Sequence, residues 1–169
     1  TQKMSQIGSP RSRTPSDAAS AFNLRSAPAT TPTRRVLIIY CGGTMGMKWV
    51  DGSGYVPVSG YLYSILSSLP YFNTPLYVAD DVYNTYDGML EGPLYIPAST
   101  SGPAIQYHIL EHAVLLDSSN MTMDDWRQIG AELECWYDRF DGFVVIHGTD
   151  TLAYTAAALS FMLEGLGKP

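Results

Sequence analysis

Two runs of consecutive apolar residues stand out along the chain and predict buried strands. They cover residues 36–40 and 143–147. Strands of a parallel sheet are covered by helices on both faces, so they lack the polar–apolar alternation of half-exposed strands. Residues 105–116 contain further apolar runs that are compatible with one or two more strands.

Three segments combine helical spacing of apolar residues with helix start or stop signals. They cover residues 61–69, 122–136 and about 151–166. Thr122 is a favourable N-cap for the second segment, and Gly167 is the expected stop of the third. Strands separated by helices predict an α/β fold with a mainly parallel sheet flanked by helices.

Other stretches lack such periodicity. Residues 1–33 are rich in Ser, Thr, Pro, Ala and Arg, which predicts a disordered tail. Residues 51–54 predict a flexible loop, and residues 73–104 predict an irregular excursion, because both are interrupted by turn-forming residues. The predicted organisation is therefore a tail over 1–33 and one folded domain over 34–169.

Composition and charge disfavour some classes of binding partner. Of the 169 residues, 46% are hydrophobic and 15% charged, which is enough to build one core. Residues 36–169 hold four Lys or Arg and fifteen acidic residues, a net charge of −11 that disfavours nucleic acid. No stretch approaches the ~20 apolar residues of a membrane span. Cys41 and Cys135 lack CxxC spacing and predict free thiols in a reducing compartment.

Polar residues follow the predicted strands, where ligands bind in open α/β sheets. The three clusters are Gly42-Gly43-Thr44, Asp117-Ser118-Ser119 and Thr149-Asp150. Glycines before Thr44 allow a sharp turn and close approach of a substrate. Thr149 and Asp150 precede a helix N-terminus, whose N–H groups face an anion or a developing oxyanion. Taken singly, each cluster is more typical of ordinary turn and capping residues than of a functional site.

Several other chemistries are disfavoured by their motifs. Cys41 stands where a dinucleotide-binding fingerprint ending at Gly46 needs glycine, and neither a P-loop nor a G-x-S-x-G elbow occurs. Three histidines are present without a Glu-x-x-His arrangement, so we interpret them as structural or exposed rather than as metal ligands. They are His108, His112 and His147.

Together the clusters resemble the L-asparaginase family. Residues 40–47, Tyr-Cys-Gly-Gly-Thr-Met-Gly-Met, are similar to its signature Thr-Gly-Gly-Thr-Ile-Gly-Met. Residues 54–60 are similar to the segment that follows it in bacterial type I enzymes, and residues 117–122 resemble Asp-Ser-Ser-Asp-Met-Thr. Residues 137–169, which contain His-Gly-Thr-Asp-Thr, are similar throughout. The resemblance to type I, cytosolic-type members covers residues 35–169 apart from the excursion.

The resemblance implies a catalytic role for four residues. Thr44 would be the nucleophile that forms a covalent β-aspartyl enzyme. Tyr55, on the flexible loop, would close over the substrate and assist Thr44. Thr149 would help to place the attacked carbonyl or the water, and Asp150 would bind the α-ammonium of the substrate.

Substrate binding is implied for the loop after the middle strand, in addition to Thr149 and Asp150. Asp117, Ser118 and Ser119 match the family segment that holds the α-carboxylate of L-asparagine. An amino-acid zwitterion needs an acid for its ammonium and several donors for its carboxylate, and these loops supply both. No metal or organic cofactor is implied, because water is the second substrate.

The resemblance also implies that the chain is an incomplete N-terminal asparaginase domain of Rossmann-like or flavodoxin-like type. The family's catalytic lysine and smaller C-terminal domain would lie beyond Pro169, so the chain alone is expected to be inactive. The full-length protein is expected to be a cytoplasmic homo-oligomer, a dimer or tetramer, with no nucleic-acid or membrane partner.

Alternative functions stay open at this point. A glutaminase would need room for one more methylene, which a pocket discriminates by only about 1–3 kcal/mol. The excursion at 73–104 resembles the longer segment of eukaryotic members, some of which are described as lysophospholipases. The asparaginase-like subunit of a tRNA-dependent amidotransferase carries a folded domain ahead of the signature, which residues 1–33 do not predict. The last alternative is a non-catalytic truncated product.

Overall fold

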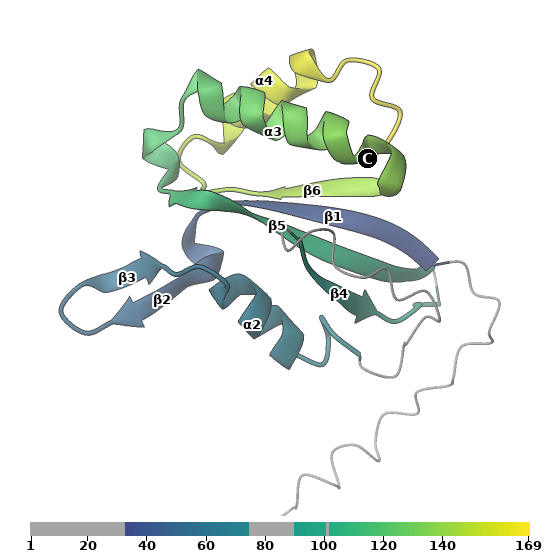
Figure 1. The fold of residues 1–169 in the computed structure, drawn as a ribbon, viewed down its shortest axis with the longest axis horizontal. Helices are drawn as coiled ribbons and strands as arrows, with labels where there is room; N and C mark the ends of the chain where they lie inside the picture. The colour runs from purple at the N-terminus through teal and green to yellow at the C-terminus, as the bar shows by residue number, and fades with distance from the viewer. Residues whose placement is uncertain (1–32, 75–89, 101) are drawn as a thin grey trace, which may run out of the picture. The chain divides into compact units, whose positions relative to one another are not determined.

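Four strands form the central sheet in the order β4-β5-β1-β6 (Figure 1). The computed structural model describes residues 33–74, 90–100 and 102–169. The strands are β1 (Thr33–Gly42), β4 (Leu90–Ile96), β5 (Ala104–Leu116) and β6 (Gly142–Ile146). β1 pairs in parallel with β5 and β6, whereas β4 is antiparallel to β5. The prediction of a mainly parallel α/β sheet is confirmed.

Helices cover both faces of this sheet (Figure 1). α3 (Met123–Trp136) and α4 (Leu152–Met162) lie on one face, and α2 (Tyr61–Ser68) lies on the other. On the α3 side, Leu37 and Ile39 of β1 belong to a buried cluster with Ile129, and Tyr40 belongs to the cluster that includes Leu62 of α2. Burial on both faces explains why β1 is a continuous apolar run.

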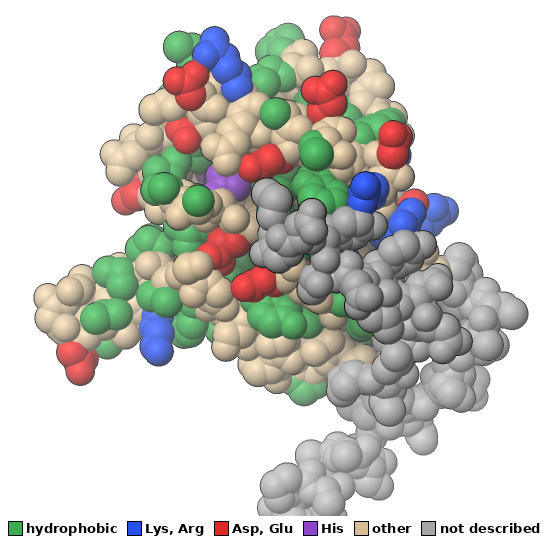
Figure 2. All heavy atoms as spheres, viewed as in Figure 1, with side chains coloured by type: hydrophobic (Ala, Val, Ile, Leu, Met, Phe, Trp, Pro, Cys, Tyr) green, Lys and Arg blue, Asp and Glu red, His purple; other side chains and the backbone are tan. Residues whose placement is uncertain are grey.

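A β-hairpin leaves the sheet immediately after β1. The turn η1 (Thr44–Gly46) leads into β2 (Met47–Val50), which pairs antiparallel with β3 (Gly54–Pro57). The hairpin extends away from the sheet in Figure 1, and Figure 2 shows hydrophobic side chains along it. The predicted flexible loop at 51–54 is therefore the tip of a hairpin, whose two short strands were not predicted.

The start and end of α3 are fixed by side chains. The Asp125 carboxylate accepts hydrogen bonds from the Thr122 amide at 2.7 Å and from its hydroxyl at 2.6 Å. Both bonds lower the pKa of Asp125, and the bond from the hydroxyl contributes the most. After α3, Lys168 Nζ donates to the carbonyls of Tyr137, at 2.5 Å, and Phe140, at 3.0 Å. A lysine in this place satisfies carbonyls that a helix end leaves free.

Two of the predicted segments are corrected by the structure. α4 ends at Met162 rather than near Leu166, because the chain turns out of the helix and Gly165 takes a left-handed φ of 79°. The excursion at 73–104 contains β4, whose Gly92-Pro93 pair interrupts the strand pattern at a shift in pairing register.

Some predictions fall outside the described residues. The predicted tail lies there over residues 1–32, and so do residues 75–89 of the excursion. Two shorter 3-10 turns complete the described elements, namely η2 (Ser118–Asn120) and η3 (Tyr137–Arg139). Within the described residues, none of the helices combines the length and apolar character needed to cross a membrane.

Candidate active site

The glycine turn after β1 lies directly against two other strand ends. Gly42 and Gly43 have φ values of 133° and 89°, which side chains rarely adopt. A Cβ on Gly42 would overlap the carbonyl oxygen of Leu116, and a Cβ on Gly43 would lie 2.8 Å from the backbone nitrogen of Gly148. The sharp turn predicted from the two glycines is present, and their missing side chains make room for neighbouring backbone.

The loops after β5 and β6 also contact each other. A Cβ on Gly148 would lie 2.6 Å from the hydroxyl oxygen of Ser118. The hydroxyl of Thr151 donates to the Ser118 carbonyl at 2.7 Å. β1, β5 and β6 are parallel, so their carboxyl ends meet at one edge of the sheet. Segments 42–44, 116–119 and 147–151 form what we call the loop cluster.

Most of the predicted site residues are exposed on this cluster. The side chains of Thr44, Ser119, Thr149 and Asp150 are exposed. Ser118 is different, since it is 4% exposed and its hydroxyl lies against Gly148. The structure therefore brings together the loops that carry the predicted hydroxyls and carboxylate, and it uses Ser118 to pack them.

A buried tyrosine supports the glycine turn from below. Tyr40 is 0% exposed, and its hydroxyl donates to the Gly43 carbonyl at 3.4 Å. Burial raises the pKa of Tyr40, and the nearby Glu111 carboxylate raises it further. The phenol therefore keeps the proton that it donates. A Cβ on Gly46 would overlap this hydroxyl. The turn that carries Thr44 is therefore fixed at both ends.

Asp117 is oriented within its own loop. Its carboxylate accepts hydrogen bonds from the Ser119 amide at 3.0 Å and from the Ser119 hydroxyl at 2.9 Å. The amide bond, followed by the hydroxyl bond, lowers the pKa of Asp117, which favours the carboxylate form. The ordered loop presents this negative charge beside the cluster.

Tyr55 lies on the hairpin rather than in the loop cluster. Its ring is 69% exposed and packs edge-to-face on Trp49, with ring centroids 5.4 Å apart. The two residues are cross-strand partners. The root of the hairpin adjoins η1, because the Val58 amide donates to the Gly46 carbonyl at 3.4 Å. The hairpin that carries Tyr55 therefore starts next to Thr44.

Glu111 is a contributor that the sequence analysis missed. It extends from β5 and accepts hydrogen bonds from the Ser59 hydroxyl at 2.5 Å and from the Gly60 amide at 3.0 Å. These bonds join the end of the hairpin to the sheet. The available signal was an acidic residue inside the apolar run of residues 105–116. Nearby, burial and the Glu111 charge raise the pKa of Glu91.

Two of the three histidines, His108 and His112, are buried among other side chains. His112 Nε2 lies 2.8 Å from a Glu132 carboxylate oxygen and 3.9 Å from the Cys41 sulfur. Burial raises the pKa of Cys41 to about 12. His108 packs edge-to-face on Phe140, and burial lowers its pKa. In the part of the chain that the structure describes, no group of three or more His, Cys, Asp or Glu side chains is placed to hold a metal ion.

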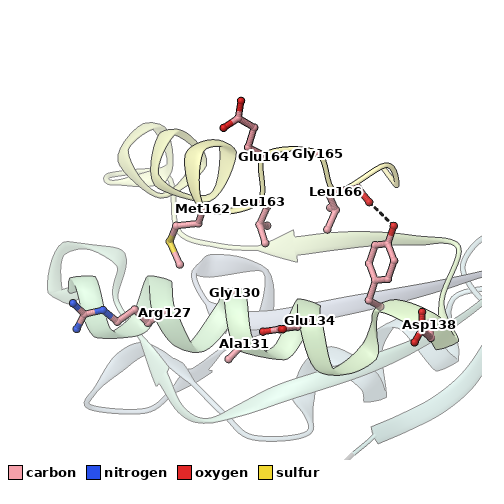
Figure 3. Close-up of a pocket in the computed structure, with 11 residues that line it drawn as sticks. Arg127, Gly130, Ala131, Glu134, Asp138, Met162, Leu163, Glu164, Gly165 and Leu166 are labelled. Carbon is pink, nitrogen blue, oxygen red and sulfur yellow. Dashed lines mark hydrogen bonds between the residues drawn. The ribbon is translucent and has the colours of Figure 1, made fainter.

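A groove between α3 and α4 is separate from the candidate site (Figure 3). Its lining includes Arg127, Glu134 and Met162, and at one end Tyr137 donates a hydrogen bond to the Leu166 carbonyl at 2.5 Å. None of the predicted site residues lines it. The groove therefore does not enter the assignment of the site.

Comparison with known proteins identifies the relatives of this arrangement. The family described as Asparaginase, N-terminal, matches residues 35–169. An L-asparaginase of Dirofilaria immitis is 46% identical over 136 residues, which cover 79% of this chain and 22% of that protein. A 60 kDa lysophospholipase of Mus musculus is 43% identical over 143 residues, covering 85% of this chain and 24% of that protein.

A solved structure gives the same result in three dimensions. The crystal structure of L-asparaginase I from Vibrio cholerae matches with a TM-score of 0.52 and 39% identity, covering 77% of this chain and 30% of that one. The chain thus spans less than a third of the length of each of these proteins. With the family match over most of its residues, the chain belongs to the asparaginase family, whose N-terminal domain it represents.

Proposed function

We propose that the full-length protein hydrolyses the side-chain amide of L-asparagine to L-aspartate and ammonia. The observation that carries this proposal is the loop cluster. It gathers the exposed hydroxyls of Thr44 and Thr149 and the exposed carboxylate of Asp150 at one edge of the sheet. Membership in a family that contains L-asparaginases supports the substrate class.

The proposed reaction proceeds through a covalent intermediate. Thr44 Oγ attacks the amide carbon, the C–N bond breaks, and ammonia leaves with a proton taken from the hydroxyl. Water then attacks the resulting ester carbon, which releases L-aspartate and returns the proton to Thr44 Oγ. A threonine hydroxyl needs a base for the first step. We propose that this base is a lysine located beyond Pro169, so that the chain alone lacks activity.

The remaining site residues would bind the zwitterion. The Asp150 carboxylate would pair with the α-ammonium, which is a strong charge-assisted interaction. The Asp117–Ser119 segment would bind the α-carboxylate, and the ordered Asp117–Ser119 contacts support a fixed geometry there. Thr149 would place the attacked carbonyl or the water. Tyr55 would approach Thr44 when the hairpin closes over the substrate and would assist the nucleophile.

The setting of this activity is also a proposal. We propose a cytoplasmic homo-oligomer that needs no cofactor. The free thiols Cys41 and Cys135 are consistent with a reducing compartment.

The central test is the ammonia released from L-asparagine by the full-length protein and by Thr44→Ala and Thr44→Ser variants. The alanine variant is expected to lose at least about 10³-fold in kcat, as removal of a nucleophile does. The serine variant keeps a hydroxyl and should retain measurable turnover. Comparable activity of Thr44→Ala and the unmodified protein would remove Thr44 from the reaction.

A second candidate is hydrolysis of a lysophospholipid ester at the same site. The similarity to a 60 kDa lysophospholipase favours it, and a threonine nucleophile can attack an ester as well as an amide. Initial rates on L-asparagine, L-glutamine and lysophosphatidylcholine separate the possibilities. Asparagine is expected to be the fastest substrate, and faster cleavage of the lipid ester would replace the proposal with the second candidate.

A further inference from the structure

We propose that Trp126, Thr155 and His147 form a hydrogen-bond relay that fixes the peptide between Gly148 and Thr149. The relay makes them positioning residues for the second active-site loop. Its existence does not depend on the reaction, whereas its effect on catalysis rests on the proposed function.

The relay connects three separate elements. Trp126 Nε1 of α3 donates to the Thr155 hydroxyl oxygen of α4 at 2.9 Å. The same hydroxyl lies 2.9 Å from His147 Nε2, directly after β6. On the other side of the ring, His147 Nδ1 lies 2.6 Å from the carbonyl oxygen of Gly148. The two helices on one face of the sheet therefore reach the loop through one imidazole.

The chemistry of the end groups fixes the direction of the two outer bonds of the relay. An indole N–H only donates and a carbonyl only accepts. The Thr155 oxygen accepts from Trp126, so its own proton is free for His147 Nε2. His147 Nδ1 must carry a proton to bond the Gly148 carbonyl. A neutral imidazole carries one proton, so the network assigns the Nδ1–H tautomer to neutral His147, and Nε2 then accepts from Thr155.

This tautomer holds the loop in one orientation. A peptide unit is planar and trans, so its C=O and N–H groups point in opposite directions. Holding the Gly148 carbonyl at the His147 ring therefore turns the Thr149 N–H away from that ring. On its other side Gly148 leaves no room for a side chain beside Ser118. The peptide that leads into Thr149 is constrained from two directions.

The burial of Thr155 indicates that the hydroxyl is specifically needed. Thr155 is 1% exposed and is the buried residue of α4, a helix that is otherwise rich in apolar residues. A buried hydroxyl is costly unless it is hydrogen-bonded. A purely packing role at this position would be filled by an apolar side chain of similar shape. The relay uses the polar group instead.

The first test is spectroscopic and uses the 169-residue chain. Ring nitrogens of ¹⁵N-labelled histidine report the tautomer at an alkaline pH where free imidazole is neutral. The unmodified chain should show Nδ1 protonated in His147. Thr155→Val, which removes the donor to Nε2, should mix the tautomers and shift the Thr149 amide signal. Thr155→Ser keeps the hydroxyl and should preserve both signals.

A second variant keeps the test decisive if Thr155→Val does not fold. Trp126→Phe removes the indole donor but keeps an aromatic ring, and it should also alter the His147 ring signals. An Nε2–H tautomer in the unmodified chain would overturn the inference. So would ring and amide signals that stay unchanged in both Thr155→Val and Trp126→Phe.

The second test measures catalysis in the full-length protein. Thr155→Val is expected to lower kcat/KM for L-asparagine by about 10- to 100-fold, as small displacements of catalytic groups do. Thr155→Ser should recover most of this loss. Unchanged kcat/KM in Thr155→Val would overturn the positioning role. Absence of amidase activity in the unmodified protein would defeat the proposed function alone, because the ring and amide signals still decide whether the relay exists.

Discussion

The β2–β3 hairpin directly follows the first segment of the loop cluster along the chain, yet the hairpin and the cluster are held in different ways. In the loop cluster, neighbouring loops pack so closely that Gly42, Gly43 and Gly148 have no room for a Cβ. The hairpin is held by its own ladder and by contacts at its root, where Val58 bonds to Gly46 and Glu111 binds Ser59 and Gly60. These root contacts are hydrogen bonds, and Lys48 of β2 also lies over the Tyr61 ring of α2, with its Nζ 5.8 Å from the ring centroid.

The difference suggests that the two regions have different roles in the proposed site. Groups that must keep a fixed geometry, such as Thr44, Thr149 and Asp150, extend from the tightly packed cluster. The residue that we expect to move, Tyr55, lies on the hairpin, outside the tightly packed cluster, and it is 69% exposed. Active-site lids are drawn from regions of low local stability, while the supporting shell is rigid.

The largest expected effect comes from adding one methyl group to the cluster. Gly43→Ala forces a left-handed φ on a side chain, at about 1–2 kcal/mol. It also drives a Cβ into the backbone of Gly148, and overpacking of this kind typically costs ~1–3 kcal/mol more. The free energy of unfolding, measured by urea denaturation, should fall by about 2–5 kcal/mol.

Gly52→Ala is the matched control on the hairpin. Gly52 has a φ of 82°, close to that of Gly43, but nothing lies within 4 Å of a Cβ placed there. It should therefore show only the conformational cost of about 1–2 kcal/mol. Equal losses in the two variants would mean that the cluster is no tighter than the hairpin.

A smaller effect is expected from the side-chain tie between two loops of the cluster. Thr151→Val removes the hydroxyl that donates to Ser118, whose carbonyl still accepts from the Met121 amide at 3.1 Å. One lost hydrogen bond of this kind corresponds to about 0.5–1.5 kcal/mol of unfolding free energy. Thr151→Ser keeps the donor and should lose less. A serine variant as unstable as the valine variant would show that the methyl group, rather than the hydrogen bond, ties the loops.

The same contrast explains what the sequence could predict. Thr44 and Asp150 were predicted to lie near each other because polar residues that follow apolar strands meet at one edge of a parallel sheet. That rule places loops, but it does not say which side chains face outward. Ser118 was predicted to bind substrate, and the structure buries it against Gly148. Its burial depends on contacts between loops that are distant in sequence.

The features that the sequence analysis missed have separate causes. β4 was hidden because Gly92 and Pro93 interrupt it, and pairing with β5 overrides the weak local pattern. The hairpin strands, 47–50 and 54–57, are only four residues long, too short for a clear alternation. The hydrogen bonds of Glu111 to the hairpin could not be predicted, because its partners are more than fifty positions away in the sequence.

The next smaller effect is expected at the root of the hairpin, and the destabilisation should be confined to that region. Glu111→Ala removes the acceptor of Ser59 and Gly60, and it should increase amide hydrogen exchange over residues 54–60. The free energy of global unfolding should change by no more than about 1 kcal/mol, because local opening does not require global unfolding. Ser59→Ala removes one of the same hydrogen bonds and should give an intermediate result. Unchanged exchange in Glu111→Ala would show that the ladder alone holds the arm.

The smallest expected effect depends on pH and tests the charge beside that root. The pKa of Glu91 is raised above its ordinary value of 4.5 by burial and by Glu111, so the folded chain favours the protonated form. The stabilisation from this protonation is complete below pH 4.5 and is lost as the pH rises through the folded-state pKa. Glu91→Gln should therefore be more stable than the unmodified chain at neutral pH, and the gap should narrow on acidification. Urea denaturation at several pH values measures the gap. A gap that does not change with pH would mean that Glu91 titrates alike in both states, and the root of the hairpin would then carry no electrostatic strain.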